Sequence, residues 1–214
     1  PLVIEKEAAT SRRSRAPGIL PRSLEVFGQW GVADAILEAG IFLREVSAYS
    51  AATDKPLATV PLHALADESR YAGLCILEQG TTERILLEAF QDAGGEVRFD
   101  HELTGVTQDG AGVVATVRRG GSSTQVRARY LAACDGASST VREALGLPFD
   151  GKTYDVDAVL ADIRLPHMRN AAFPRVADDT NRLMFAVRLE SGAWRMVSVE
   201  RSGERRGSDV EPAE

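Results

Sequence analysis

The chain has 214 residues, of which 44% are hydrophobic, 26% charged and 6% aromatic, and its formal net charge is −6. This composition excludes disordered, collagen-like and disulfide-stapled chains, and the acidic balance argues against nucleic acid or an anionic membrane surface as partner. No stretch approaches the roughly 20 consecutive apolar residues of a membrane helix, so we expect a cytoplasmic protein. The 2 cysteines and 3 histidines lack metal-ligand spacing, so we expect no metal site.

The N-terminal part of the chain alternates between strand and helix patterns. Leu2–Ile4 is an uninterrupted apolar run, typical of a strand that is buried on both faces inside a parallel sheet. Residues 9–21 are rich in Arg, Ser, Pro and Gly, and they predict a loop. Two short helices and then two short strands are expected after it. Their expected ranges are 23–30, 32–39, 42–49 and 57–62.

The middle of the chain predicts one longer helix followed by an antiparallel meander. Apolar residues recur at helical spacing over 81–93, and Gly94-Gly95 ends the pattern. Strand periodicity then begins, with turn signals at the Asp-Gly and Gly-Gly pairs. The expected strands are 96–99, 103–108, 113–118 and 124–129.

The apolar run 130–134 predicts another buried strand, which delivers Asp135-Gly136 to a helix over about 138–145. If this motif is a plain capped turn, Ser138 or Thr140 is expected to cap the helix, with Glu143 completing a capping box. Beyond Pro148, apolar and polar residues alternate, which predicts half-exposed antiparallel strands. These strands are expected around 159–165 and 183–189, and 202–214 reads as a loop or frayed tail.

Three places carry residues suited to nucleotide binding. Glu5, followed by Lys6, ends the first strand, where a carboxylate can accept hydrogen bonds from ribose hydroxyls; the alternative is a solvated strand-end charge. Arg15 closes an arginine-rich loop suited to pyrophosphate, unless this is an ordinary basic surface loop. Asp135-Gly136 lets the backbone approach an anion at a helix start, unless it is a plain capped turn.

The order of these features resembles that of FAD-dependent aromatic-ring monooxygenases with the para-hydroxybenzoate hydroxylase fold, in the branch of phenol, polyketide and rifampicin hydroxylases. The most specific motif is C-D-G-A-S-S-T-V-R at 134–142, and R-A-P-G-I-L-P-R-S-L-E-V-F at 15–27 is a looser match. The resemblance covers about 1–200. It implies an α/β fold with a Rossmann-like FAD-binding domain that carries a β-meander, plus a mostly antiparallel substrate domain.

The resemblance also implies which residues bind FAD. Glu5 would hold the adenosine ribose with Lys6 beside it, and Val106 would touch adenine through its backbone. Asp135 would stand near the pyrophosphate and the path of the nicotinamide. The remaining implied groups are two loop arginines, a glutamine at a helix start and an arginine that supports the charge network: Arg15, Arg13, Gln79 and Arg142.

The implied domains are discontinuous. The FAD-binding domain would comprise 1–40 and 73–148, and the substrate domain 41–72 and 149–214, with the substrate between them. The family's G-x-G-x-x-G strand and its Gly-Asp flavin motif are not in the sequence. We therefore expect an internal piece of a longer protein, and we expect this piece alone to bind FAD weakly or not at all.

The implied reaction uses NADPH or NADH and O2 to insert one oxygen atom into a small aromatic, phenolic or polyketide-like substrate. No catalytic acid or base is assigned, because the conceivable lining groups are better explained as structural or exposed: Tyr49, Tyr154, His63 and Arg188. The alternatives are an epoxidase, Baeyer-Villiger oxygenase or reductase of the same fold, a catalytically silent truncated fragment, and an unrelated α/β binding module. Substrate identity, the choice of nicotinamide and the oligomeric state stay open at this point.

Overall fold

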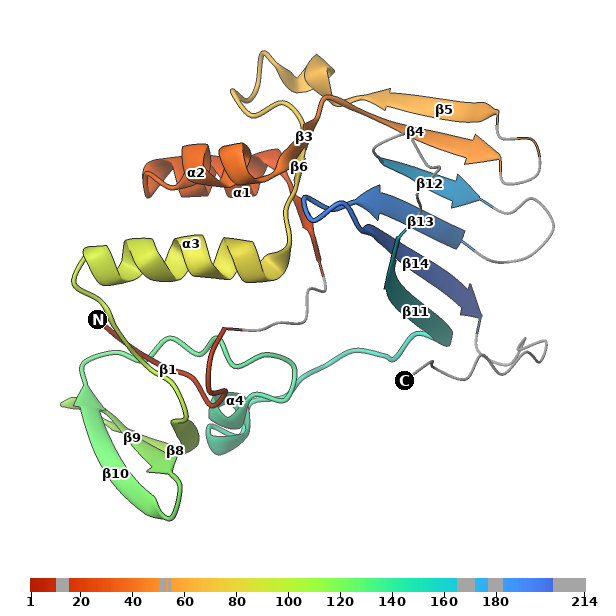
Figure 1. The fold of residues 1–214 in the computed structure, drawn as a ribbon. Coiled ribbons are helices and arrows are strands. Elements are labelled where there is room, and N and C mark those ends of the chain that lie inside the picture. Colours follow the sequence, from red (N-terminus) through yellow and green to blue (C-terminus); the bar gives the residue numbers. More distant parts are fainter. Residues whose placement is uncertain (11–15, 51–52, 54, 165–171, 177–182, 202–214) are drawn as a thin grey trace. The chain divides into compact units, whose positions relative to one another are not determined.

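The structure is a computed structural model that contains both helices and strands (Figure 1). It describes residues 1–10, 16–50, 53, 55–164, 172–176 and 183–201, with the backbone alone for 172–176, 183, 200 and 201. The chain divides into two compact units. The first is Pro1–Arg13 with Glu83–Lys152, and the second is Ser14–Thr82 with Thr153–Glu214. These boundaries differ from those of the two domains predicted from the sequence, which group residues 14–40 with the segment that contains Asp135. The predicted functional domains stay a prediction.

The first unit opens with strand β1 (Leu2–Ile4), which is paired in parallel, as predicted. Its partner is β7 (Glu96–Arg98), so the prediction that 96–99 belongs to the antiparallel meander is wrong. The expectation that β1 is buried on both faces is wrong, since Val3 is 43% exposed. Within the described residues, β1 and β7 form a sheet of only two strands. Leu2 and Ile4 are half-buried, whereas Val3 on the opposite face is exposed, so this strand is shielded on one face at most.

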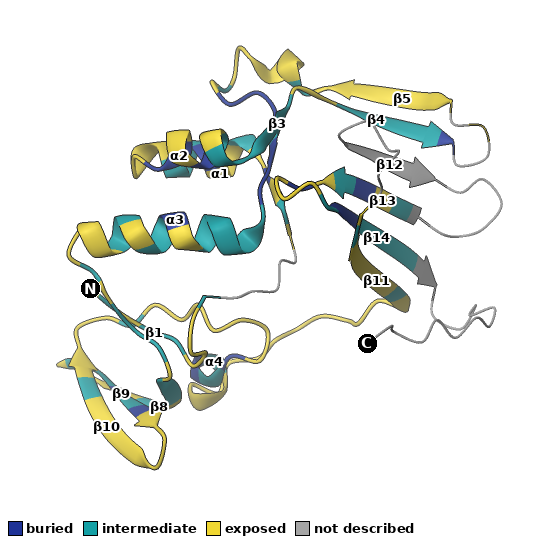
Figure 2. Ribbon diagram, viewed as in Figure 1, coloured by how far each residue is buried: buried dark blue, intermediate teal, exposed yellow. Residues whose placement is uncertain are grey.

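The expected meander is present in the same unit. Its strands β8 (Glu102–Asp109), β9 (Gly112–Arg119) and β10 (Ser122–Ala128) are antiparallel in the order β10-β9-β8. The first turn requires a glycine at position 112, where φ is 137° and a Cβ atom would lie 2.4 Å from the Ala128 carbonyl oxygen. Most of β10 is exposed (Figure 2), so the buried side of this small sheet comes mainly from β9.

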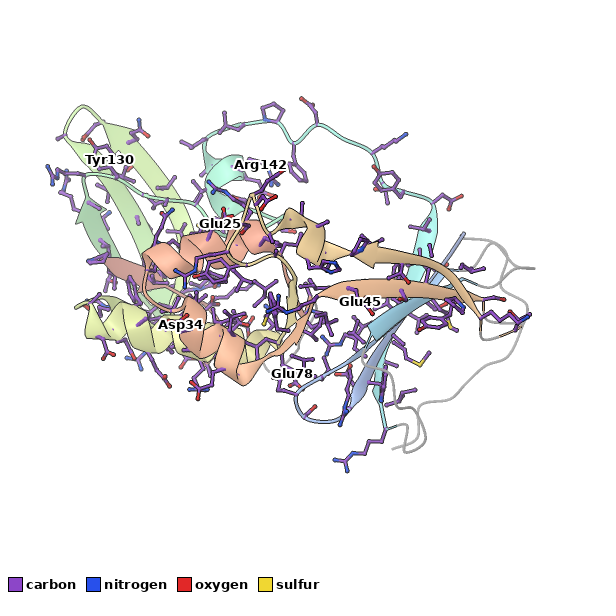
Figure 3. The ribbon with its side chains drawn as sticks, turned by 90° about the horizontal axis from the view of Figure 1, so that it is seen from above. Glu25, Asp34, Glu45, Glu78, Tyr130 and Arg142 are labelled. Carbon is purple, nitrogen blue, oxygen red and sulfur yellow. The ribbon has the colours of Figure 1, made fainter. Side chains whose placement is uncertain are left out.

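The segment after β10 differs from the prediction. Residues 130–134 form no strand, and the Tyr130 side chain is 87% exposed (Figure 3 labels it). An apolar run becomes a strand only where another strand accepts its backbone hydrogen bonds, and none of the described strands pairs with it. Helix α4 (Thr140–Ala144) follows and packs against β8; it is shorter than the predicted range.

The second unit contains a small antiparallel sheet and two short helices. Its sheet has the order β2-β6-β3, from β2 (Gly18–Ile19), β6 (Leu74–Ile76) and β3 (Ile41–Leu43). The helices are α1 (Pro21–Gln29) and α2 (Ala33–Ala39), near the predicted ranges, and α1 begins at a proline, which favours a first helical position. The core here includes Leu24, Ile36, Cys75, Ile76 and Leu77. Helix α3 (Gln79–Asp92) begins in this unit.

A six-stranded sheet completes the second unit, in the order β11-β14-β13-β12-β4-β5. All neighbours are antiparallel except β12 and β4, so the expectation of a mostly antiparallel sheet is confirmed. The single strand predicted over 42–49 is in fact β3 and β4, which belong to different sheets. A 3-10 turn, Leu62–Leu65, follows β5. The strands are β4 (Glu45–Ser50), β5 (Pro56–Pro61), β11 (Val156–Ile163), β12 (Ala172–Val176), β13 (Leu183–Arg188) and β14 (Trp194–Arg201).

Buried Trp194 and Ala186 pack with Tyr49, Ile163 and Met196 on one face of this sheet. This places Tyr49, one of the conceivable lining groups, in a hydrophobic cluster. In the part of the chain that the structure describes, no helix is long and apolar enough to cross a membrane. Nor do the described residues contain a group of three or more His, Cys, Asp and Glu side chains that could hold a metal ion.

Candidate cofactor site

Glu5 stands directly after β1, where the sequence predicts a ribose-binding acid. Its backbone N–H donates to the Arg98 carbonyl oxygen at 3.0 Å, which extends the β1–β7 pairing by one residue. Its Oε1 accepts a hydrogen bond from the Glu7 N–H at 2.8 Å, so the carboxylate is held by its own turn. Since an ionised carboxylate offers about four lone-pair positions, this contact leaves acceptor capacity for the hydroxyls of a ligand.

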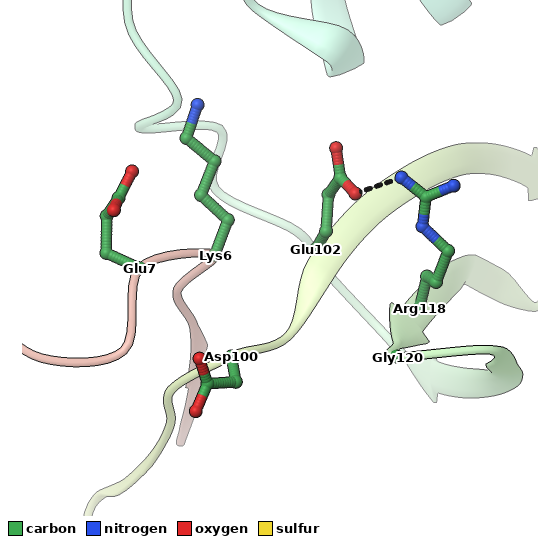
Figure 4. A pocket seen from close by; sticks show the side chains of 6 residues that line it. All are labelled: Lys6, Glu7, Asp100, Glu102, Arg118 and Gly120. Atoms are coloured by element: carbon green, nitrogen blue, oxygen red, sulfur yellow. Dashed lines mark hydrogen bonds and ion pairs between the residues drawn. The ribbon is translucent and has the colours of Figure 1, made fainter.

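Lys6 lies at the edge of a shallow hollow in the first unit, with a volume of about 540 Å³. Figure 4 shows Lys6 and Glu7 on one side of this hollow and the ion pair of Glu102 with Arg118 on the other. The hollow is lined by both signs of charge: Lys6, Glu7, Asp100, Glu102, Arg118 and Gly120. It is therefore a polar surface that suits a hydrogen-bonding ligand better than an apolar one.

Asp100, which lines the hollow, has a left-handed backbone with φ 57°. Aspartate tolerates this conformation better than most residues. The Asp100 N–H donates to the Glu7 carbonyl oxygen and the His101 N–H to that of Glu5, both at 3.0 Å. These bonds fix the turn after β1 to the β7–β8 connection. The sequence did not predict that Asp100 and His101 bind the turn after β1. The one sequence feature that marks this segment is a polar Asp-His pair between two predicted strands.

Asp135 organises the start of α4 through both of its carboxylate oxygens. Oδ1 accepts from the Ser139 hydroxyl at 2.6 Å and Oδ2 from the Val141 N–H at 3.2 Å. These bonds, with that of Ser139 the largest cause, lower the pKa of Asp135 below its ordinary value. The adjacent Gly136 has φ 81°, and a Cβ atom at that position would meet no atom within 4 Å, so space is open beside this turn.

The cap of α4 is Ser139, whose Oγ accepts from the Arg142 N–H at 3.0 Å. The expectation of Ser138 or Thr140 as cap, with Glu143 closing a box, is therefore wrong. Asp135 adds a second acceptor at the same helix start, because its carboxylate accepts from the Val141 N–H, one of the first-turn donors that have no intrahelical partner. The motif therefore forms a capped turn, with Ser139 as the cap in place of Ser138 or Thr140, and the role of Asp135 toward a ligand stays a prediction.

Arg142 supports the same turn from inside α4 (Figure 3). Its guanidinium donates to the Ala137 carbonyl oxygen at 2.7 Å and lies over the Phe149 ring, 4.5 Å from the ring centroid. Its contact with Glu143 is long, at 4.0 Å. The side chain therefore holds the backbone of the Asp135-Gly136 turn in place.

The structure brings four of the predicted FAD-binding residues into the first unit: Glu5, Lys6, Val106 and Asp135. Val106 lies in β8, opposite Ala115 of β9. Gln79 is the first residue of α3 and belongs to the second unit. Arg13 and Arg15 lie outside the described residues. The role of each toward FAD stays a prediction.

The remaining conceivable lining groups are scattered. His63 is exposed, with Nδ1 3.4 Å from the Arg44 carbonyl oxygen, and Tyr154 is also exposed. Arg188 is the exposed last residue of β13. We therefore assign none of them a chemical role.

The sequence did not predict an ion pair in the second unit between a buried arginine and an exposed aspartate. Arg195, 2% exposed, donates to both oxygens of Asp162 at 2.8 and 2.7 Å. Asp162 first, and then the charges of Glu78 and Glu190, raise the pKa of Arg195 against the opposing effect of its burial. The two partners face each other in the β11–β14 register, a pairing that sequence periodicity alone does not reveal.

Comparison with known proteins identifies relatives for nearly the whole chain. A family model described as "FAD binding domain" matches residues 1–209. The chain is 32% identical over 198 residues to a rifampicin monooxygenase from Streptomyces venezuelae, covering 92% of this chain and 40% of that protein. It therefore spans about two fifths of the length of this curated relative.

Solved structures agree with this match. The p-nitrophenol 4-monooxygenase PnpA from Pseudomonas putida DLL-E4 superposes with a TM-score of 0.86 at 24% identity, over 96% of this chain and 52% of that one. The aklavinone-11 hydroxylase, solved as a ternary complex with FAD and aklavinone, superposes with a TM-score of 0.80 at 26% identity, over 95% of this chain and 42% of that one. These likenesses confirm the expected fold class.

Proposed function

Because the chain belongs to the family of FAD binding domains, we propose that it is part of a flavin-dependent monooxygenase that acts on small aromatic, phenolic or polyketide-like substrates. The resemblance predicted from the motifs is confirmed by this membership. The observation that carries the proposal is the family match along residues 1–209, because it includes both the Glu5 turn and the Asp135 turn. NADPH or NADH and O2 are the proposed co-substrates.

The described residues fit FAD by their chemistry. Glu5 retains acceptor positions for ribose hydroxyls next to a polar hollow that carries Lys6. No atom lies within 4 Å of where a Cβ atom of Gly136 would be, so a ligand has room to approach the backbone of this turn. When bound, FAD would supply the redox chemistry that passes electrons from the nicotinamide to O2.

The residues of the chain would bind and orient. We propose that Glu5 accepts hydrogen bonds from the ribose, that Lys6 lies beside the adenosine and that Val106 contacts the adenine through its backbone. Asp135, kept ionised by Ser139 and Val141, would hold its turn against the pyrophosphate side. Gln79 would contact FAD from the start of α3, and Arg15 from its loop. We also propose a cytoplasmic location and the domains 1–40 with 73–148 and 41–72 with 149–214.

The test is to express the complete reading frame that encodes this chain and to measure NADPH and NADH consumption with phenolic and polyketide-like substrates under ¹⁸O₂. We expect substrate-dependent consumption and a product that gains one ¹⁸O atom as a ring hydroxyl. A ring-expanded ester or an epoxide would instead support the alternative oxygenases of the same fold, and reduction without oxygen gain would support a reductase. The 214-residue chain alone is predicted to bind FAD weakly or not at all.

A further inference from the structure

The turn between β13 and β14 reaches the start of α3. This turn is closed by two backbone bonds, from the Leu189 N–H to the Ala193 carbonyl oxygen at 2.9 Å and from the Gly192 N–H to that of Leu189 at 3.0 Å. Glu190 is exposed in the turn, yet both of its carboxylate oxygens accept from the Glu78 N–H at 3.1 Å. The Thr81 hydroxyl donates to the same carboxylate at 3.3 Å.

These donors bracket Gln79. Glu78 precedes it and Thr81 stands two residues after it, and the Glu78 carbonyl oxygen accepts from the Thr81 and Thr82 N–H groups at 3.0 and 3.1 Å. A helix leaves the N–H groups of its first turn without intrahelical partners, and a negative charge at this end interacts favourably with the helix dipole. Glu190, from the turn between β13 and β14, therefore acts as the hydrogen-bond acceptor at the start of α3, a role that a neighbouring side chain plays in a local helix cap.

We infer that Glu190 is a positioning residue: its carboxylate fixes the first turn of α3 and thereby orients Gln79 for contact with the flavin. The last step rests on the proposed function, whereas the fixing of the helix start does not. The charge of Arg195 also lies near enough to interact with the charges of Glu78 and Glu190.

The first experiment needs no flavin. Amide hydrogen exchange is measured by mass spectrometry on peptides that cover 78–82, in the parent protein and in Glu190→Ala, with Glu88→Gln as the control. Glu88 lies on the same helix but pairs only with Arg84 in an exposed (i, i+4) contact among the described interactions. We expect exchange about tenfold faster in Glu190→Ala, because the Glu78 N–H and the Thr81 hydroxyl lose their acceptor at the helix start, and unchanged in the control. Unchanged exchange in Glu190→Ala overturns the inference.

The second experiment separates positioning from general stability. The FAD dissociation constant is measured for the protein expressed from the complete reading frame and for its variants Glu190→Ala, Gln79→Ala and the double variant. We expect Glu190→Ala to weaken binding about fivefold alone and to have no further effect once Gln79 is absent, since coupled residues are not additive. Independent effects of the two substitutions overturn the inference.

A matched pair at Thr81 adds a rescue. Thr81→Ser keeps the hydroxyl that bonds Glu190 and is expected to retain the parent exchange rate and FAD affinity, whereas Thr81→Ala is expected to lose part of both. Equal behaviour of the two variants counts against the inference. If the parent protein itself binds no FAD, the proposed function fails, and the inferred role toward Gln79 fails with it. If the parent protein binds FAD and Glu190→Ala changes neither the FAD affinity nor the exchange rate, the inference alone is overturned.

Discussion

The two compact units differ in what they contain: the second has most of the buried core, and the first has most of the predicted FAD-binding residues. Among the described residues, the largest fully buried side chains lie almost entirely in the second unit: Trp194, Leu24, Ile36, Ile76, Leu77, Leu189 and Cys75, against Val117 in the first. The first unit instead contains most of the residues predicted to hold FAD. The turns of Glu5 and Asp135 are therefore held by hydrogen bonds at the surface rather than by a deep core.

The largest expected effect is on the core of the second unit. Leu24 is fully buried in α1. Leu24→Ala removes buried methyl groups and leaves a cavity, so we expect the free energy of unfolding to fall by about 2–5 kcal/mol. Urea unfolding followed by circular dichroism checks this. A loss below about 1 kcal/mol would show that the core at Leu24 is looser than the structure indicates.

The corresponding core substitution in the first unit is expected to reduce the free energy of unfolding by a smaller amount. Val117 of β9 is 1% exposed, and Val117→Ala removes fewer carbon atoms from a shallower core. We expect a loss of about 2 kcal/mol, measured in the same urea experiment. A loss equal to or greater than that of Leu24→Ala would break the contrast between the two units.

The Asp135 turn provides a pH-dependent comparison. Hydrogen bonds from Ser139 and Val141 lower the pKa of Asp135 in the folded state, so the stability they confer is present above the ordinary aspartate pKa and is lost as the pH falls through the lowered value. Asp135→Asn is therefore expected to be less stable than the parent at neutral pH, with a difference that shrinks below about pH 4. Unfolding at several pH values measures it. A difference that does not change with pH would rule out this account of Asp135.

The smallest effect distinguishes the two cysteines without unfolding the protein. Cys75 is buried in the second unit, and burial first, then the charge of Glu190, raises the pKa of its thiol to about 11. Cys134 is exposed in the first unit. Because the thiolate is the reactive form, we expect a thiol reagent such as DTNB at pH 8 to modify Cys134 rapidly and Cys75 slowly. Cys134→Ser should abolish the fast phase, and fast modification of that variant would contradict the burial of Cys75.

Sequence reasoning succeeded where neighbours along the chain decide the structure. The strands β8, β9 and β10 with their turn at Gly112 and the helix ending near Gly94 follow from local pattern. It failed where the outcome depends on distant partners. The run 130–134 has no described strand to pair with, and the pattern over 42–49 is divided between two sheets because its first part pairs with β6.

The candidate site shows the same division. The Asp135 motif and Glu5 were found from their residues, since a polar group directly after a strand or before a helix leaves a local signal. Glu190 and the Asp162–Arg195 pair were missed, because Glu190 lies 112 residues from Glu78 and only the strand register brings Asp162 to Arg195. The cap at Ser139 was misplaced by one residue, since three neighbouring hydroxyls offer the same chemistry.

The most direct test is an equilibrium FAD titration of the protein expressed from the complete reading frame, followed by flavin fluorescence, with Glu5→Gln and the control Glu88→Gln in parallel. Glu88 pairs with Arg84 in an exposed contact on α3. We predict one FAD per chain, a severalfold weaker dissociation constant for Glu5→Gln because its amide accepts fewer hydrogen bonds from the ribose, and little change for Glu88→Gln. Absence of FAD binding by the parent protein would contradict the account.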